Sequence, residues 1–221
     1  MAKLAELVHD QLSQQNYTHP LVGTATLELA PSTLHEQIQQ FARVTVGAGC
    51  QQIQLLPLFL LPGVHVMEDI PAEVALAQAN LGNAIALNLQ PHLGANLGLG
   101  RLLAKQLSLL KTDAKILLAH GSRRIGGNEP IEIIANTLGM VAAYWSMQPT
   151  LEEQVKILAD AGNQEIMIVP YFLFPGSITD AISQMVASLQ EQFPLLLLRL
   201  GEPMGVSAEL AQLVVDLIIE V

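Results

Sequence analysis

The sequence is poor in cysteine, in basic residues and in long apolar runs, and each scarcity argues against a class of protein. A single cysteine, Cys50, stands among 221 residues, so we expect neither a disulfide framework nor a cysteine metal cluster, and a reducing cytoplasm fits. Ten basic side chains stand against twenty acidic ones, for a net charge of −10, which argues against nucleic-acid binding. No apolar run approaches the roughly 18 residues that span a membrane, so no membrane partner is expected. The charges along the first sixteen residues are unlike a signal peptide.

Aliphatic residues are abundant. Hydrophobic residues make up 51% of the chain and aromatic residues only 4%, which suits helices packed on buried parallel strands. Apolar runs that alternate with amphipathic segments predict an α/β fold with right-handed crossovers. The expected strands are 20–29, 52–61, 84–89, 115–119, 140–145, 165–174 and 195–200. The expected helices include 3–15, one ending at Leu110, others beginning near residues 32, 70, 130 and 150, and a last one ending near Glu220.

The two halves of the chain are repeats of each other. LLPLFLLPG at 55–63 matches IVPYFLFPG at 168–176, and ELAPS at 28–32 matches SMQPT at 146–150. A fainter match relates PHLG at 91–94 to PMG further on. Because the matches keep their order, the sequence predicts an internal duplication. We expect one α/β lobe in residues 1–112 and a second in residues 113–221.

The repeats differ at the polar residues that follow strands. The second repeat has a strand at 115–119 before its first helix, whereas the first repeat begins with that helix. Either the first repeat lacks the strand, or the start of the chain has been assigned too late. His65 falls opposite Ile178, and Glu28 falls opposite Ser146. Each repeat therefore carries only some of the polar residues that follow strands.

The segment KILLAHGSRR, residues 115–124, passes abruptly from an apolar strand to polar residues. In an open α/β sheet, ligands bind at the carboxyl ends of the strands. We therefore expect His120 to stand at a ligand-binding rim, where the chain turns at Gly121. A strand that simply ends in a polar turn is the alternative.

Four segments together, ILLAHGSRR, LELAPS, LPLFLLPGVHVMEDIP and PHLG, resemble the CbiX-type sirohydrochlorin chelatases. These belong to the class II chelatases, with the anaerobic cobaltochelatase CbiK and protoporphyrin ferrochelatase. The resemblance covers nearly the whole chain as two family units. It implies two flavodoxin-like lobes facing a cleft, and insertion of Co²⁺ or Fe²⁺ into sirohydrochlorin on the route to cobalamin or sirohaem. It implies no organic cofactor or ATP, and it implies that the divalent metal is a substrate.

The resemblance implies that His120, from the HGS motif, and His65, from the G-x-H-V loop, bind the metal and accept pyrrole protons. Imidazole suits Co²⁺ and Fe²⁺ as a ligand, and it titrates near neutral pH. Glu28 is a candidate third metal ligand, with a surface role as the alternative. Because the two histidines come from opposite repeats, we expect a composite site, formed within one chain or completed by a second.

Five residues are assigned to substrate binding: Ser122, Arg123, Arg124, His92 and Glu68. The two arginines suit the eight carboxylates of sirohydrochlorin, since a guanidinium pairs with a carboxylate in bidentate geometry. A solvated basic turn is the alternative for them, and a loop role is the alternative for His92.

Other polar or flexible residues are given structural roles. Met67 is interpreted as filling a gap under its loop and Asp69 as a helix N-cap. His9, His19 and His35 are interpreted as surface residues.

The sequence bears on two further function classes. A metal or tetrapyrrole chaperone that binds without turnover remains an alternative to the enzyme, whether as a monomer with two lobes or as a homodimer. A nucleotide-binding protein is disfavoured, because the chain has neither G-x-G-x-x-G after a first strand nor a P-loop.

Overall fold

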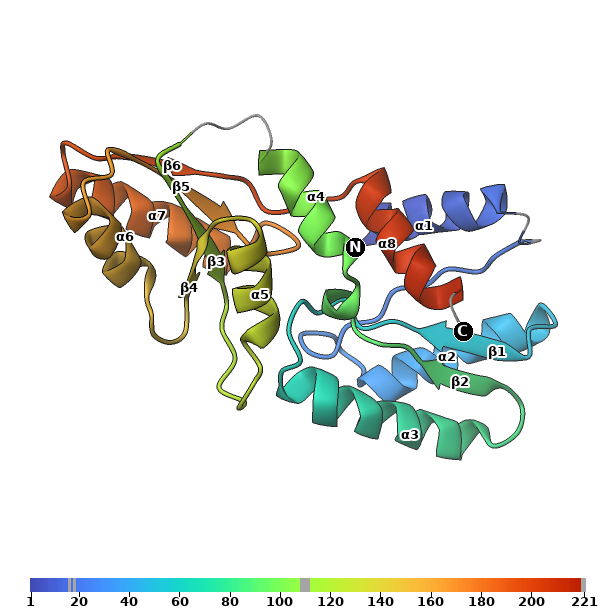
Figure 1. The fold of residues 1–221 in the computed structure, drawn as a ribbon. Coiled ribbons are helices and arrows are strands. Elements are labelled where there is room, and N and C mark those ends of the chain that lie inside the picture. Colours follow the sequence, from blue (N-terminus) through green and yellow to red (C-terminus); the bar gives the residue numbers. More distant parts are fainter. Residues whose placement is uncertain (16, 18, 108–111, 220–221) are drawn as a thin grey trace. The chain divides into compact units, whose positions relative to one another are not determined.

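The computed structural model describes residues 1–15, 17, 19–107 and 112–219, and it shows two compact units (Figure 1). The first unit comprises Met1–Asn96 and Ser207–Val221, and the second comprises Leu97–Val206. Every strand pair in both units is parallel, and helices flank the strands. The predicted α/β class is confirmed. No helix within the described residues is long and apolar enough to cross a membrane.

The second unit contains a four-stranded sheet in the order β4-β3-β5-β6. Its strands are β3 (Ala114–Ala119), β4 (Val141–Tyr144), β5 (Glu165–Pro170) and β6 (Leu197–Leu200). Its helices are α4 (Gly98–Leu107), α5 (Glu129–Thr137), α6 (Leu151–Asp160) and α7 (Ser177–Gln192). Ile116, Leu117 and Leu118 of β3 are fully buried, because strands and helices enclose β3 on every side.

The first unit has a smaller sheet of two strands, β1 (Gln52–Leu55) and β2 (Ala86–Leu89). Its α-helices are α1 (Ala2–Gln14), α2 (Leu34–Gly47), α3 (Ile70–Leu81) and α8 (Ala208–Ile219). A π-helical turn, η1 (His65–Asp69), precedes α3, and a 3₁₀ turn, η2 (Leu93–Ala95), follows β2. Ile38, Ile70 and Val74 form the core between α2 and α3.

The duplication is visible in strand register and in helix capping. Gln52 pairs with Ala86 in the first unit, and Glu165 pairs with Leu197 in the second, so β1–β2 corresponds to β5–β6. Both α2 and α6 begin with a capping box, formed by Thr33 with Glu36 and by Thr150 with Glu153. The same sequence signals therefore start the same elements in both halves.

The predicted strand at 20–29 is wrong, because this described segment contains no strand. Its counterpart by the repeat offset is β4, which pairs only with β3. The described residues of the first unit form only β1 and β2, so a strand at 20–29 finds no counterpart of β3 there for its main-chain hydrogen bonds. The extended segment is held instead by Gln37, which bonds to the amide and the carbonyl of Thr26 at 3.0 and 2.9 Å.

Two other predicted strands are longer than the strands in the structure. Strand 52–61 ends at Leu55, two residues before Pro57, and strand 165–174 ends at Pro170. Proline lacks the N–H that a ladder requires, which explains both ends. The last predicted residues of the helix ending at Leu110 and of the one ending at Glu220 lie outside the described residues.

The last helix of each repeat belongs to the compact unit of the other repeat. Helix α8 packs on α1 (Figure 1), where Gln11 donates a 2.7 Å hydrogen bond to the carbonyl of Ala208. Asn96 donates to the carbonyl of Leu213 at 3.0 Å. Helix α4, which ends the first repeat, is grouped with the second unit. The compact units therefore differ from the sequence repeats by an exchange of terminal helices.

We predict that Thr150→Ala lowers the free energy of unfolding by about 1 kcal/mol, because the Thr150 hydroxyl accepts the amide hydrogen of Glu153 at 3.2 Å. The only tryptophan, Trp145, packs on the core of this unit, so its fluorescence during urea unfolding measures the effect. Thr137→Ala, at an exposed position of α5, is the control and should change stability by less than about 0.5 kcal/mol. Equal losses in the two variants would contradict the capping argument.

Candidate functional site

His65 lies in the π-helical turn that leads into α3. The Ile70 amide donates to the His65 carbonyl, the five-residue spacing of a π-helix. From Gly63 to the core residue Ile70 there are seven steps, whereas the counterparts Gly176 and Ile182 are six steps apart. The first repeat therefore carries one extra residue here, and the π turn accommodates it. Such single-turn insertions are frequent at functional sites.

The His65 ring is held in place by two neighbours. Its Nδ1 lies 2.7 Å from Oδ2 of Asp69, and both side chains are 46% exposed. Its ring centroid lies 6.0 Å from that of Phe59, at an interplanar angle of 50°. When Nδ1 donates to the carboxylate, Nε2 is left as the acceptor, which is the usual arrangement of a metal-binding imidazole.

Asp69 is therefore not the N-cap that the sequence predicted. Its backbone is helical, and its side chain makes no capping hydrogen bond. Because the π turn continues into α3 without interruption, the helix has no free amides at Asp69, and the carboxylate is available to His65.

The loop after β2 lies beside the end of β1. The amide of Leu93 donates to the Pro57 carbonyl at 2.9 Å, and the amide of Gly94 donates to the Phe59 carbonyl at 2.9 Å. A side chain at Gly94 would collide with the Leu60 carbonyl, so this close approach requires glycine. The loop holds His92 half-buried at this edge, and burial lowers the pKa of its imidazole. His65 and His92 thus follow neighbouring strands of one sheet.

Glu28, Glu68 and Met67 are exposed parts of the same unit. Glu28 follows Leu27, which packs on the core between α2 and α3. Glu68 lies in the π turn. Met67 is 50% exposed, so the interpretation that it fills a gap under the loop is wrong. Among the described residues, no three or more histidine, cysteine or acidic side chains are grouped closely enough to hold a metal ion.

His120 lies in the second unit, directly after β3, and its side chain is exposed. Its Nδ1 lies 3.0 Å from the Gly121 carbonyl, and its own carbonyl accepts hydrogen bonds from the Ser146 amide and hydroxyl at 3.0 and 2.9 Å. Gly121 has φ of +87° and lies against Met147. A glycine is needed at this turn, because the conformation is left-handed and a Cβ would clash.

Ser122 is buried under the same loop, at 8% exposure. Its amide donates to Asn128 Oδ1 at 2.8 Å, and Asn128 Nδ2 donates back to its carbonyl at 2.9 Å. The Ser122 hydroxyl accepts from the Arg124 amide at 3.3 Å. These bonds tie the loop to the start of α5 and leave Arg123 and Arg124 exposed. Sequence reasoning missed Asn128, although an asparagine before Glu-Pro is a typical signal for a helix start.

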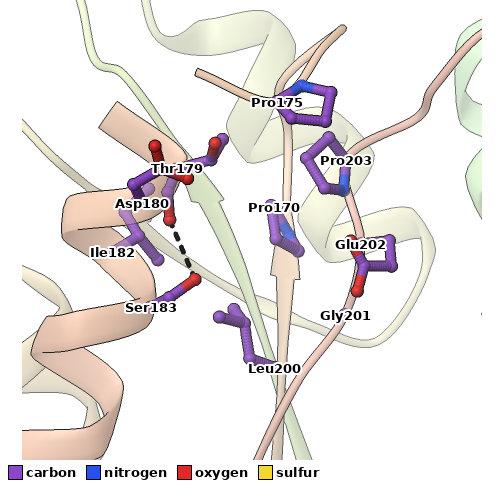
Figure 2. A pocket seen from close by; sticks show the side chains of 10 residues that line it. All are labelled: Pro170, Pro175, Thr179, Asp180, Ile182, Ser183, Leu200, Gly201, Glu202 and Pro203. Carbon is purple, nitrogen blue, oxygen red and sulfur yellow. Dashed lines mark hydrogen bonds between the residues drawn. The ribbon is translucent and has the colours of Figure 1, made fainter. Parts of the chain in front are cut away.

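A small cavity lies where β5 and β6 end and α7 begins (Figure 2). Its volume is about 130 Å³, below the several hundred Å³ usual for ligand sites. It lies in the place that corresponds to the His65 and His92 edge, but Ile178 and Pro203 replace the two histidines. The Ser183 hydroxyl on its wall donates to the Thr179 carbonyl at 3.0 Å. The candidate site residues of the second unit therefore all lie after β3.

The surface interpretation of His35 is also wrong. Its Nδ1 lies 2.8 Å from Oε2 of Glu73, and its side chain is 19% exposed. The His35 amide donates to the same carboxylate at 2.9 Å and lowers the pKa of Glu73. This pair joins the start of α2 to α3.

The expected site residues thus fall into two groups. The first unit holds Glu28, His65, Glu68 and His92, and the second holds His120, Ser122, Arg123 and Arg124. The geometry brings His65 and His92 to one sheet edge. That His65 and His120 serve one metal ion stays a prediction, because they belong to different units.

We predict that lowering the pH from about 7 to about 5 reduces the free energy of unfolding less in His92→Gln than in the wild type. Burial lowers the pKa of His92, so the unfolded chain binds the proton more readily, and stability falls as the pH drops from about 6.5 through the folded pKa. Glutamine cannot take up this proton. Urea unfolding at both pH values measures the difference, and identical pH dependence in the two proteins would contradict the argument.

Comparison with known proteins identifies both halves. The CbiX family model matches residues 1–109 and again residues 114–221. A sirohydrochlorin ferrochelatase of Priestia megaterium is 23% identical over 189 residues, covering 80% of this chain and 69% of that protein. A sirohydrochlorin cobaltochelatase of Priestia megaterium is 25% identical over 198 residues, covering 78% and 60%.

A solved structure shares the fold. The sirohydrochlorin chelatase SirB from Bacillus subtilis subspecies spizizenii, in complex with cobalt, superposes with a TM-score of 0.74 at 20% identity, over 99% of this chain and 87% of that one. The duplication predicted from the sequence is confirmed, because one family model matches twice. The chain belongs to the CbiX family and carries two units of it in tandem.

Proposed function

We propose that this chain is a metal chelatase, a lyase that inserts Co²⁺ or Fe²⁺ into sirohydrochlorin for cobalamin or sirohaem synthesis. The observation that carries the proposal is the His65–Asp69 pair on the π turn, 2.7 Å between Nδ1 and Oδ2. A carboxylate that fixes one ring nitrogen and leaves the other free suits an imidazole that receives a metal or a proton. The names of the two Priestia relatives agree with this reaction.

The chemistry of insertion assigns roles to the histidines. Metallation releases two pyrrole protons, and an imidazole can accept one of them near neutral pH. The Asp69 carboxylate compensates the charge when His65 takes up that proton. His120, exposed on a loop fixed by Ser146 and Asn128, provides a second imidazole. Glu28 and Glu68 supply further oxygen ligands or proton acceptors for the divalent metal.

Arg123 and Arg124 provide the contacts for the carboxylates of the substrate. They lie exposed on the loop after His120, in a chain whose net charge is −10. A local pair of guanidiniums offsets the repulsion that a polycarboxylate otherwise meets at an acidic surface. His92 and Ser122 complete the proposed substrate set, Ser122 through the loop that it holds in place.

The proposal extends to the cofactor, the cellular location and the oligomeric state. The metal enters as a substrate, and no organic cofactor takes part. We place the protein in the cytoplasm, where the single thiol of Cys50 stays reduced, as a monomer or a homodimer.

We predict that His120→Ala abolishes metal insertion and leaves the fold intact, because the side chain is exposed. The absorbance change of sirohydrochlorin on addition of Co²⁺ measures insertion, and thermal unfolding checks the fold. His9→Ala, at an exposed position of α1, is the control and should insert metal at the wild-type rate. Full activity in His120→Ala would remove His120 from the mechanism, and sirohydrochlorin binding without insertion by the wild type would favour a chaperone.

The same proteins test whether the two histidines share a metal ion. If they do, the wild type binds one Co²⁺ in equilibrium dialysis, and His65→Ala and His120→Ala each lose it. Two ions per chain, with one lost in each variant, would show separate sites.

We predict that Arg123→Ala raises KM for sirohydrochlorin about tenfold with little change in kcat. A guanidinium that holds a peripheral carboxylate contributes equally to substrate and transition-state binding, and loss of such uniform binding appears in KM. The matched control is Arg43→Ala, which removes an exposed arginine from α2. An unchanged KM at low salt, where charge pairs are strongest, would exclude Arg123 from substrate binding.

A further inference from the structure

The ring of His120 contacts the backbone of the turn that follows it. Its Nδ1 lies 3.0 Å from the carbonyl oxygen of Gly121. A carbonyl only accepts hydrogen bonds, so this contact requires the proton on Nδ1 and leaves the lone pair on Nε2. His65 reaches the same state through the Asp69 carboxylate, 2.7 Å from its Nδ1. Both candidate histidines therefore present Nε2, but His120 is held by a main-chain carbonyl.

The Gly121 carbonyl belongs to a peptide group whose other end is held by Asn128. The bond between Gly121 and Ser122 is trans, so its C=O and its N–H point in opposite directions. The N–H, which is that of Ser122, donates to Asn128 Oδ1 at 2.8 Å. Rotation of this peptide plane would break that hydrogen bond and move the carbonyl away from the His120 ring. One rigid group thus connects Asn128 to Nδ1 of His120.

The other end of the Asn128 amide is engaged at the same loop. Its Nδ2 donates to the Ser122 carbonyl at 2.9 Å and to Met147 Sδ at 3.1 Å. A flipped amide would place N–H against N–H and oxygen against oxygen at Ser122, so these contacts fix its orientation. The side chain therefore holds both main-chain polar groups of Ser122 in a single arrangement.

Asn128 does not perform the structural role that its position suggests. It is the N-cap residue of α5, yet its side chain makes no capping hydrogen bond. An asparagine at this position normally accepts from an amide of the first helical turn and so stabilises the helix. Capping of α5 therefore does not account for the contacts of Asn128, which go to Ser122 and Met147.

We propose that Asn128 is a positioning residue for His120. By holding the peptide between Gly121 and Ser122, it fixes the carbonyl that binds Nδ1–H, and it thereby sets the tautomer of the ring and the direction of Nε2. The inference rests on the proposed function, in which the His120 imidazole receives the metal or a pyrrole proton. Groups that orient a metal-binding imidazole through its other nitrogen typically change affinity or activity by roughly 10- to 100-fold.

The test compares Asn128→Ala with the wild type by NMR of protein whose histidine rings carry ¹⁵N, without metal or substrate. At about pH 8.5, where an ordinary imidazole is neutral, the two ring shifts show which nitrogen carries the proton, and His120→Ala identifies the signals. We expect the proton on Nδ1 of His120 in the wild type. In Asn128→Ala we expect it mainly on Nε2, the preferred tautomer of an unconstrained histidine, and kcat for insertion should fall about tenfold or more.

A matched control and a second variant separate this effect from a loss of stability. Asn163→Ala removes another asparagine amide of the second unit, which donates to the Leu158 carbonyl of α6 at 2.7 Å, and it should keep the wild-type tautomer and kcat. If thermal unfolding shows that Asn128→Ala folds poorly, Asn128→Ser takes its place. Serine is a favourable N-cap residue, but it has no amide to bridge the N–H and C=O of Ser122.

The outcomes for this inference and for the proposed function differ. If the wild type inserts metal and the folded variant keeps the wild-type tautomer or kcat, the positioning role is overturned and the chelatase stands. If the wild type inserts no metal, the proposed function fails and the ring shifts still decide. A change of His120 to the Nε2–H tautomer in the folded variant then supports the role of Asn128. An unchanged ring, or a wild type with the proton on Nε2, overturns it.

Discussion

The main-chain pairing of β3 with strands on both of its edges is the constraint on which the second unit depends. With β3 in place, β4 and β5 each have a neighbour, and the HGS loop is presented at the end of a buried strand. The described residues of the first unit include no such strand. Its sheet keeps two strands, and residues 20–29 remain extended without a ladder. His120 follows β3 in the second unit, and the described part of the first unit, which holds His65, has no strand that corresponds to β3.

Much of the fold could be predicted from the sequence, because its signals are local. Helix starts followed from capping residues such as Thr33 and Thr150, and the duplication followed from repeated strand-loop motifs. The error at 20–29 has a non-local cause. A run of β-type residues shows that a segment can be extended, but only the neighbouring strand decides whether it joins a sheet. The overlong strand at 52–61 had a visible signal in Pro57 that sets its end.

The residues of the candidate site stay a prediction from motifs, and several of their contacts could not be predicted from the sequence. Motifs located His65 and His120 on loops at strand ends; the structure has His120 directly after β3 and His65 in the π turn that leads into α3. The partner of His65 was missed, because Asp69 sits at a position typical of a helix cap and the extra residue of the π turn changes its role. The His35–Glu73 pair was missed because the two residues are 38 positions apart and meet only when α2 packs on α3. Ser122 belongs to the HGS motif, but its side chain is buried. Its hydrogen bonds to Asn128 show that it holds the loop in place.

The exchange of α4 and α8 makes each compact unit discontinuous in sequence. A fragment cut at the repeat boundary near residue 112 would lack α8 and expose Leu4, Val8 and Leu12, the buried face of α1. The first unit can be completed only after the last helix has been synthesised, so the two halves depend on one another during folding although each contains its own sheet. Deletion of either repeat would therefore remove a helix from the compact unit that remains.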